Sequence, residues 1–345
     1  MTTNAPKNTL LKTSIRWMLR LIGPAILAYF LYTTDFRQLI AHLLNVNWVP
    51  VLISLALYLP FIVVKSWRWN MIMTDLGMQA PPLTYSSILY MIGLFIGGAT
   101  PGQSGDFIKA WYLRERGQAL APALFSILLD RLFDFMIMAL LSLWGLIAFL
   151  QAFPAEHQPS ILFGTLGFTA LILIITPVLM VRRPRELMMS YVLRITPKGL
   201  RPKLEHLRKQ FHSLDLKLPL FGKLFFATML SATSTMVRLW LLFLAMQINI
   251  PLLPMVTVMA LISILQALPI SISGAGVREV PMIALLASYG YTQEQAIGLS
   301  VLFLLINIEH ILIGFLVSLR YPLGQTPPAD LAALQSEGLP DDKTQ

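Results

Sequence analysis

The sequence predicts an all-α integral membrane protein with six full transmembrane helices and two re-entrant helical hairpins in an inverted-repeat architecture. Of the 345 residues, 56% are hydrophobic and only 12% are charged. An average soluble domain carries about 25% charged residues. So few ionic groups could not cover the surface of a soluble protein of this size. The chain has no cysteine, which excludes disulfides, cysteine-ligated zinc and iron–sulfur clusters.

Eight apolar segments follow one another along the chain. Most reach the ~20 residues that a helix needs to cross the hydrocarbon core of a bilayer. They cover 16–33, 48–66, 84–100, 119–150, 161–181, 222–248, 253–272 and 294–319. The first segment lacks a cleavage motif and is longer than the apolar core of a signal peptide, so we expect no cleavable signal peptide.

The third and seventh segments are interrupted by proline and glycine. The third ends in TPGQSGD at 100–106 and becomes apolar again. The seventh passes through Leu268-Pro269 and GAGVRE at 274–279 before a further apolar run. Backbone groups cannot be left unpaired in lipid, so such breaks lie inside protein or line a wet cavity.

The distribution of Lys and Arg favours one topology. If 84–116 and 253–289 are hairpins that enter and leave on the same side, Arg37 is the one loop cation outside the cell and the others lie in the cytoplasm. Both termini are then cytoplasmic, and the hairpins dip from opposite faces. Paired, interrupted segments of this kind indicate a transporter binding site. The alternative is that both segments are kinked full crossings.

We expect a single polytopic membrane domain over 1–320 and a flexible acidic cytoplasmic tail over 321–345. The cytoplasmic loop at 182–221 is strongly basic. Apolar residues at helical spacing predict an amphipathic helix within it, on the cytoplasmic leaflet, although a soluble linker helix is the alternative. These residues are Leu200, Leu204, Leu207, Phe211 and Leu214. The basic residues flank apolar spans without a groove-binding motif, so anionic lipid is the expected partner and nucleic acid is not.

Four motifs occur together in the region from roughly 15 to 320. They are Arg68-Trp69, the turn from Pro101 to Lys109, the run from Asp130 to Asp134, and the segment from Leu268 to Glu279. In this combination the chain resembles the lysylphosphatidylglycerol synthase transmembrane-domain, or flippase-like, family. It departs from the family at Gln103, Asp106 and Lys109, where Arg, Glu and Arg are common, and no soluble aminoacyl-transferase domain follows. The resemblance implies a stand-alone member in the cytoplasmic (inner) membrane.

Ionisable residues inside apolar segments are candidates for headgroup binding, because a charge in the bilayer costs free energy. Asp130 and Asp134 are four residues apart, so they share a helix face and repel each other unless a cation lies between them. Arg131 points about 100° away from Asp130 but has a long side chain. The candidate substrate-binding residues are Gly105, Asp106, Lys109, Asp130, Arg131, Asp134, Arg238, Gly274, Gly276, Arg278, Glu279 and Glu309.

Two mirrored anion sites are expected at the hairpin breaks. Gly274 and Gly276 let the backbone turn at a helix start, where free amide groups and Arg278 would attract a phosphate. Gly105 and Lys109, with Gly102, would form the other site. Less specific interpretations remain for the individual charges. Arg278 and Glu279 could simply cap a half-helix, the aspartates could pair with Arg238, Glu309 could hydrogen-bond a backbone break, and His310 could be an ordinary packed histidine.

These features predict a translocase for a polar or anionic phospholipid or a lipid-linked intermediate. The sequence has no Gly-x-x-x-x-Gly-Lys-Ser/Thr loop, so we expect no ATP hydrolysis through a P-loop, and no catalytic residue, metal or cofactor is assigned. One alternative is an accessory membrane subunit that recruits a glycosyltransferase or lipid-modifying enzyme through its basic loop. Another is a membrane-embedded lipid-phosphate enzyme with a divalent metal at Asp130 and Asp134.

Overall fold

The computed structural model describes residues 29, 32–150, 155–156, 158–196, 201, 205, 218–267 and 276–324. The described residues form helices joined by turns and contain no strand, which confirms the all-α prediction. Most of the apolar segment 16–33, most of the expected amphipathic helix at 200–214, Gly274 and the tail beyond 324 lie outside them.

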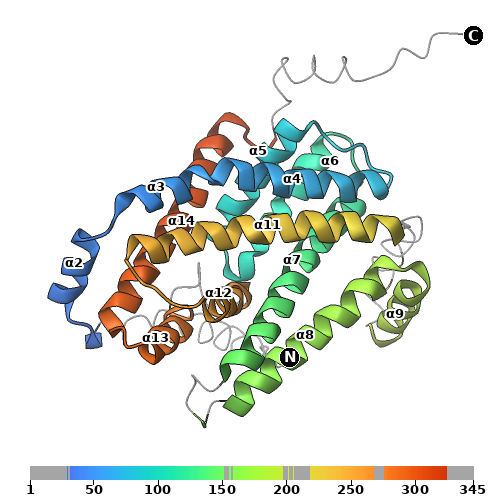
Figure 1. Ribbon diagram of the computed structural model, residues 1–345. Coiled ribbons are helices and arrows are strands. Elements are labelled where there is room, and N and C mark those ends of the chain that lie inside the picture. The colour runs from blue at the N-terminus through green and yellow to red at the C-terminus, as the bar shows by residue number, and fades with distance from the viewer. Residues whose placement is uncertain are drawn as a thin grey trace, which may run out of the picture.

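The helices follow the predicted apolar segments closely (Figure 1). Their bounds are α2 Phe36–Leu44, α3 Trp48–Ala56, α4 Tyr58–Asp75, α5 Leu83–Gly98, the 3₁₀ helix η1 Pro101–Ile108, α6 Lys109–Glu115, α7 Leu120–Phe149, α8 Gln158–Met180, α9 Arg182–Ile195, α11 Leu218–Ala245, α12 Leu252–Ala267, α13 Glu279–Ser288 and α14 Gln293–Arg320.

Several of these helices have the dimensions of membrane spans. Four helical stretches among the described residues are long and apolar enough to cross a bilayer: Trp48–Asp75, Gln158–Met180, Leu220–Ala245 and Gln293–Arg320. Helix α7 has 30 residues, about 45 Å at 1.5 Å per residue, but carries three charged residues in its first half. The chain is therefore a multi-pass membrane protein.

Prolines lie in the first turn of several helices, including Pro50 of α3 and Pro184 of α9. Pro60, Pro122, Pro254 and Pro281 each occupy the third position of α4, α7, α12 and α13. The first turn of a helix has no intrahelical acceptor for its N–H groups, so proline is tolerated there. Pro60 also cannot donate to the carbonyl of Ala56, which explains why α3 and α4 are separate helices within one apolar stretch.

Helix α14 defines two ends of the molecule. It has 28 residues and is therefore about 42 Å long. At its start, Gln293 Nε2 donates to Thr33 Oγ1 at 3.0 Å. Just after its last residue, the carbonyl of Tyr321 accepts a hydrogen bond from Tyr112 Oη at 2.9 Å. We call these the Gln293 end and the Tyr321 end.

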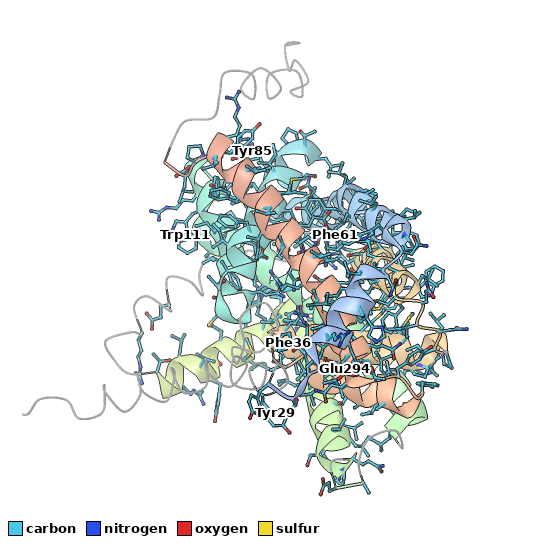
Figure 2. The ribbon with its side chains drawn as sticks, turned by 90° about the vertical axis from the view of Figure 1, so that its left-hand side faces the viewer. Tyr29, Phe36, Phe61, Tyr85, Trp111 and Glu294 are labelled. Atoms are coloured by element: carbon cyan, nitrogen blue, oxygen red, sulfur yellow. The ribbon has the colours of Figure 1, made fainter. Side chains whose placement is uncertain are left out.

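Aromatic side chains mark both ends. Figure 2 shows Tyr85 and Trp111 towards the Tyr321 end, and Tyr29 near Glu294 at the opposite end. Trp111 and Tyr29 have exposed fractions of 41% and 63%. Exposed Trp and Tyr rings collect at the two interfaces between a membrane and water. The two ends thus have the character of the two membrane faces.

In each interrupted segment, which we call the first and the second hairpin after the predicted topology, the residues that flank the helices lie close together. For α5, η1 and α6, Gln118 Nε2 donates to the carbonyl of Gln79 at 3.1 Å, close to the Tyr321 end. For α12 and α13, Tyr291 Oη accepts from the N–H of Asn249 at 2.8 Å, close to the Gln293 end. The flanking residues of the two segments therefore lie at opposite ends of the molecule. Helix α12 contacts η1, so the first hairpin reaches the second inside the molecule.

The break in the first hairpin is built by local hydrogen bonds and left-handed backbone. Helix α5 ends at Gly98, and the Oγ1 atom of Thr100 accepts the N–H of Gly105 at 2.7 Å. Gly102 and Gln103 have φ values of 62° and 53°, in the region that side chains other than glycine rarely adopt. The predicted interruption at 100–106 is confirmed. In the second hairpin, α12 ends at Ala267 and α13 begins at Glu279.

Two hydrophobic clusters hold the helices together. The first joins α4, α5 and α6 to the first half of α7, around Trp69, Leu89 and Phe133. The second joins α11, α12, α13 and α14, around Phe243 and Leu302, and includes Ile137 and Met138 from α7. We call these two clusters the packing units, and α7 contributes to both. The charged residues of α7 come just before Ile137 and Met138, where the helix enters the second unit.

Candidate functional site

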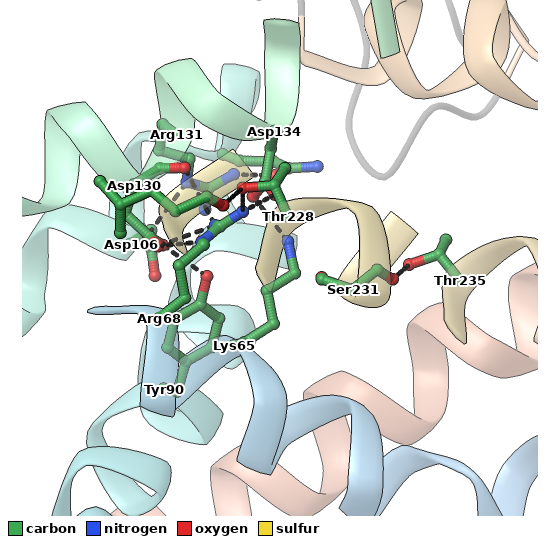
Figure 3. Close-up of polar contacts among 12 residues, drawn as sticks. Lys65, Arg68, Tyr90, Asp106, Asp130, Arg131, Asp134, Thr228, Ser231 and Thr235 are labelled. Atoms are coloured by element: carbon green, nitrogen blue, oxygen red, sulfur yellow. Dashed lines mark hydrogen bonds and ion pairs between the residues drawn. The ribbon is translucent and has the colours of Figure 1, made fainter. Parts of the chain in front are cut away.

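Arg68 on α4 bridges two carboxylates on α7. Its Nε atom lies 2.8 Å from Asp130 Oδ1, and its Nη1 atom lies 2.7 Å from Asp134 Oδ1 (Figure 3). Its Nη2 atom also donates to the backbone carbonyl of Asp130 at 3.0 Å. The side chains of Arg68 and Asp130 are completely buried. The cation that the spacing of Asp130 and Asp134 requires is therefore present, and it is an arginine from a neighbouring helix.

Lys65 completes this group one turn earlier on α4. Its Nζ atom lies 2.6 Å from Asp134 Oδ2. Tyr90 on α5 donates to Asp130 Oδ2 at 2.7 Å. Lys65, Arg68, Asp130 and Asp134, hereafter the Arg68 cluster, contain two cations and two carboxylates, so their formal charges cancel.

A second group surrounds Asp106 in the first hairpin. Lys109 Nζ and Arg131 Nε lie 2.9 Å and 3.0 Å from the same oxygen, Asp106 Oδ2. Arg131 also donates through Nη1 to the side-chain carbonyl of Gln103. Asp106, Lys109 and Arg131, hereafter the Asp106 cluster, contain two cations and one carboxylate. The long side chain of Arg131 thus reaches away from the aspartates of its own helix, as its position predicted.

Lys109 does not stand free at a helix start as the predicted anion site requires. Its side chain is completely buried, and its Nζ atom lies 4.0 Å from the ring centroid of Tyr90 and 4.8 Å from that of Trp69. Cation–π contact and the ion pair with Asp106 satisfy its charge. In the described conformation Lys109 is therefore closed off from open space, and Arg131 is the more exposed cation of this cluster. A role for Lys109 in headgroup binding stays a prediction.

Arg238 on α11 pairs with α14 and α3 instead of the aspartates of α7. Its Nη2 atom contacts the carboxylate of Glu309, and its Nη1 atom lies 3.0 Å from His310 Nε2. Its Nε atom donates to the carbonyl of Ser54 at 2.9 Å. The alternative in which Arg238 neutralises Asp130 and Asp134 is wrong, because Arg68 and Lys65 already do so. His310 stacks on Phe61 with ring centroids 5.8 Å apart, as expected of a packed histidine.

Arg278 and Glu279 form a separate buried group in the second hairpin. Arg278 Nε lies 2.6 Å from Ser300 Oγ and 3.1 Å from Glu279 Oε1. Ser300 Oγ lies 2.6 Å from the same carboxylate oxygen. Gly276 supplies the turn before them, with φ of 87°. The structure thus holds Arg278 against α14 and does not bring it together with Lys109 or Arg131.

A cavity of about 200 Å³ lies beside the first two clusters. Helices α4, α5, α7, α11, α12 and α14 contribute to its wall, together with η1. Its polar lining consists of Lys65, Tyr90, Gln103, Arg131, Asp134, Thr228, Ser231, Thr235, Ser263, Gln266, Asn307 and His310. The remaining wall is mainly apolar and includes Met138, Ile262 and Phe303. A second cavity of about 50 Å³ shares Gln103, Arg131 and Gln266 with it. We call the two together the central cavity.

The central cavity has the chemistry of a site for an amphipathic molecule. Its wall combines charged and hydrogen-bonding groups with methyl and aromatic groups. It also lies where the two hairpins meet, since Gln103 belongs to the first hairpin and Gln266 to the second. The family model of the lysylphosphatidylglycerol synthase TM region matches residues 18–337. The chain belongs to this family.

Membership in the lysylphosphatidylglycerol synthase TM family confirms the resemblance stated from the motifs and supports a membrane protein related to lipid biosynthesis. No curated protein matches the chain. We call the Arg68 cluster and the Asp106 cluster together the polar centre. It contains three of the motifs that carried the resemblance: Arg68, the pair Asp106 and Lys109, and the run from Asp130 to Asp134. The Arg278 motif lies in the other packing unit.

Three residues in or beside the polar centre were not among the candidate site residues from the sequence: Lys65, Arg68 and Tyr90. Lys65 and Arg68 had been counted as loop charges, although both are buried in α4. The two residues are three apart in an apolar stretch that also contains Trp67 and Trp69. This spacing places both charges on one helix face, and it could have indicated a buried pair. With these two and Lys109 removed from the charge count, Arg37 still stands alone on its side of the topology.

Proposed function

We propose that this protein translocates a polar or anionic phospholipid, or a lipid-linked intermediate, between the leaflets of the cytoplasmic membrane. One observation carries the proposal. A cavity with Lys65, Arg131 and Asp134 on its wall lies where two hairpins from opposite ends of the molecule meet. Ionisable residues in the interior of a membrane protein mark the path of a polar substrate. A cavity at the meeting point of the two hairpins would give a headgroup such a path.

The proposed topology has six full crossings, two re-entrant hairpins and both termini in the cytoplasm. The meeting of Gln79 with Gln118, and of Asn249 with Tyr291, supports hairpins that return to the side from which they came. Exposed Arg114 next to Tyr112 supports a cytoplasmic Tyr321 end, because Lys and Arg collect on the cytoplasmic side.

The lipid tails need not leave the bilayer during transfer. Only the headgroup would pass through the central cavity, while the apolar wall contacts the start of the acyl or prenyl chains. No chemical step is proposed, since Arg68 fills the space between Asp130 and Asp134 where a metal was considered. A lipid that crosses with a net charge would respond to the membrane potential by ~2.3 kcal/mol per charge per 100 mV.

The test is leaflet transfer in reconstituted vesicles. The purified chain is placed in vesicles that contain a fluorescent anionic phospholipid, and dithionite reports how much dye reaches the outer leaflet. We expect transfer above that of protein-free vesicles, and at least a tenfold slower rate for Arg131→Gln. The matched control is Arg182→Gln, since Arg182 forms an exposed ion pair with Glu186 on α9. Equal rates with and without the unaltered protein would refute the proposal.

A further inference from the structure

We infer that Glu309, together with Arg238 and His310, forms a proton-binding site that couples the transfer of an anionic lipid to the movement of one proton in the same direction. The inference rests on the proposed function and adds its driving force. Three features of the structure lead to it: the depth of Glu309 in the membrane, the sharing of its cation, and the position of His310 between that cation and the central cavity.

Glu309 lies deep in the membrane-spanning helix α14. It comes 16 residues after the first residue of α14 and 11 before the last, so it is about 24 Å and about 16 Å from the two ends. A charged carboxylate at this depth is costly and needs a partner. Its partner is Arg238, at the point where α11 crosses α14 (Figure 1). Uptake of a proton is the other way to remove the charge.

Glu309 shares its cation with other acceptors. Asp106 and Asp134 each contact two cations. Among the described residues, Glu309 forms an ion pair with Arg238 alone, and Arg238 also donates to His310 and to a backbone carbonyl of α3. The side chain of Glu309 is 11% exposed, so the carboxylate is not sealed. Glu309 is therefore placed to exchange its ion pair for a proton.

His310 connects this ion pair to the central cavity. It lines both parts of the cavity, and its Nε2 atom accepts from Arg238 Nη1 at 3.0 Å. A ring nitrogen that accepts carries no proton, so the neutral ring holds its proton on Nδ1. Nδ1 can then donate to an oxygen of a headgroup in the cavity. His310 thus acts as a positioning residue between the charge of Arg238 and the lipid.

Other ionisable groups determine which residue takes the proton. Those that face Glu309 and His310 from the packed helices or across the cavity are Arg238 of α11, Tyr58 and Lys65 of α4, and Arg131 and Asp134 of α7. Helix α5 packs on α14 through Met91 and Phe95, which do not ionise. Three of the facing groups are cations and would repel a proton on the ring of His310. The negatively charged Glu309 is therefore the group that takes it.

Proton uptake and headgroup binding favour each other at this site. When a proton forms an O–H bond with the carboxylate of Glu309, the charge of Arg238 is no longer compensated. An anionic headgroup beside His310 then becomes its counter-ion. The coupling is reciprocal, so the headgroup favours the protonated state of Glu309 by the same factor. When the headgroup leaves on the other side, Arg238 returns to Glu309 and the O–H bond breaks to release the proton.

Tyr58 offers a further partner in the protonated state. Its hydroxyl is buried and has no hydrogen-bond partner among the described residues. Its ring centroid lies 5.1 Å from that of His310 and 5.7 Å from the guanidinium carbon of Arg238. Buried hydroxyls are seldom left unpaired, so this one fits a site that exchanges partners. Once Glu309 is protonated, a donor of Arg238 can turn to this hydroxyl.

The first experiment measures proton uptake when lipid binds to the purified full chain in detergent. A pH-sensitive dye in weakly buffered solution reports the protons taken up after addition of phosphatidylglycerol, whose phosphate keeps its charge between about pH 5 and pH 9. We expect close to one proton per chain within this range and almost none with the zwitterionic phosphatidylcholine. Uptake below ~0.1 proton per chain at every pH, or equal uptake with both lipids, would overturn the inference.

Two variants and a control assign the proton to Glu309. The unaltered protein should bind phosphatidylglycerol about tenfold more tightly at pH 6 than at pH 8. Glu309→Gln imitates the protonated acid, so its affinity should not depend on pH and its proton uptake should vanish. Glu309→Asp keeps the carboxylate and should retain the uptake.

Glu294→Gln is the matched control, because Glu294 lies in the first turn of the same helix. It should behave like the unaltered protein. Proton uptake by Glu309→Gln equal to that of the unaltered protein would contradict the assignment. The uptake of the unaltered protein decides the inference even if Glu309→Gln does not fold.

Transfer in reconstituted vesicles separates this inference from the proposed function. With a pH difference across the membrane, we expect fluorescent phosphatidylglycerol to move about fivefold faster from the acidic to the alkaline leaflet than in the reverse direction. The charges of lipid and proton cancel, so a membrane potential should not change the rate, whereas Glu309→Gln should lose the preferred direction and respond to the potential. Proton uptake without any transfer would refute the translocase alone. Transfer at equal rates in both directions would refute the coupling alone.

Discussion

At the scale of single residues, Arg68 determines whether α7 can keep its charges inside the protein. It contacts Asp130 and Asp134, which lie 62 and 66 residues later in the chain. The spacing of the two aspartates predicted that a cation must lie between them. The sequence could not show which cation, because Arg68 and Lys65 stand near the end of an apolar segment and resemble loop charges there. Long-range pairing of this kind depends on how α4 packs on α7.

The first prediction follows from that contact. Arg68→Gln leaves Asp130 buried beside Tyr90 without a formal counter-charge, so we expect a loss of about 3–5 kcal/mol in stability. Thermal unfolding in detergent measures the effect. Arg182→Gln removes a pair in which Arg182 is 46% exposed, and it should change stability by less than ~0.5 kcal/mol. The double variant Arg68→Gln with Asp130→Asn should recover part of the loss. Similar midpoints for Arg68→Gln and Arg182→Gln would show that the bridge is unimportant.

At the scale of elements, the hairpins were the most informative part of the sequence. The Pro/Gly break at 100–106 was predicted and is present, and the long helices begin and end within a few residues of the apolar segments, except that α4 continues to Asp75. The separation of α3 from α4 was not predicted, because Pro60 lies inside a continuous apolar run. The pairing of Arg238 was also not predictable, since helix faces show which residues are buried and not which neighbour they meet.

The second prediction concerns the close packing of α5 against the Asp106 cluster in the first hairpin. A methyl group at Gly93 of α5 would meet Asp106 Oδ1 and lie 3.0 Å from Lys109 Cδ. Gly93→Ala should therefore displace the Asp106 cluster and lower stability by about 1–3 kcal/mol. Gly164→Ala on α8 is the matched control, because nothing lies within 4 Å of a methyl group there. It should be neutral or stabilising by up to ~1 kcal/mol, since alanine favours helices over glycine. If Gly93→Ala behaved like Gly164→Ala in thermal unfolding, the close packing of α5 against η1 and α6 would be disproved.

At the scale of the whole molecule, two packing units of similar make-up share α7, and their hairpins approach from opposite ends. The interrupted segments and the strong bias of Lys and Arg predicted hairpins that dip from opposite membrane faces, and that membrane topology stays a prediction. The sequence did not predict the central cavity, because its wall combines residues from six helices and η1 that are far apart in the chain. Arg131, Gln103 and Gln266 meet there although they are distant in sequence.

The central claim is that a polar headgroup reaches this cavity from both membrane faces. Because the chain has no cysteine, Ser231→Cys creates a single thiol that a membrane-impermeant maleimide can report. Leu230→Cys places the thiol on the neighbouring residue, where Leu230 is 44% exposed on the apolar outer surface of α11. We predict labelling of Ser231→Cys from each face of reconstituted vesicles, protection by an anionic phospholipid, and no labelling of Leu230→Cys. Labelling of Ser231→Cys from one face only, or from neither, would contradict the account.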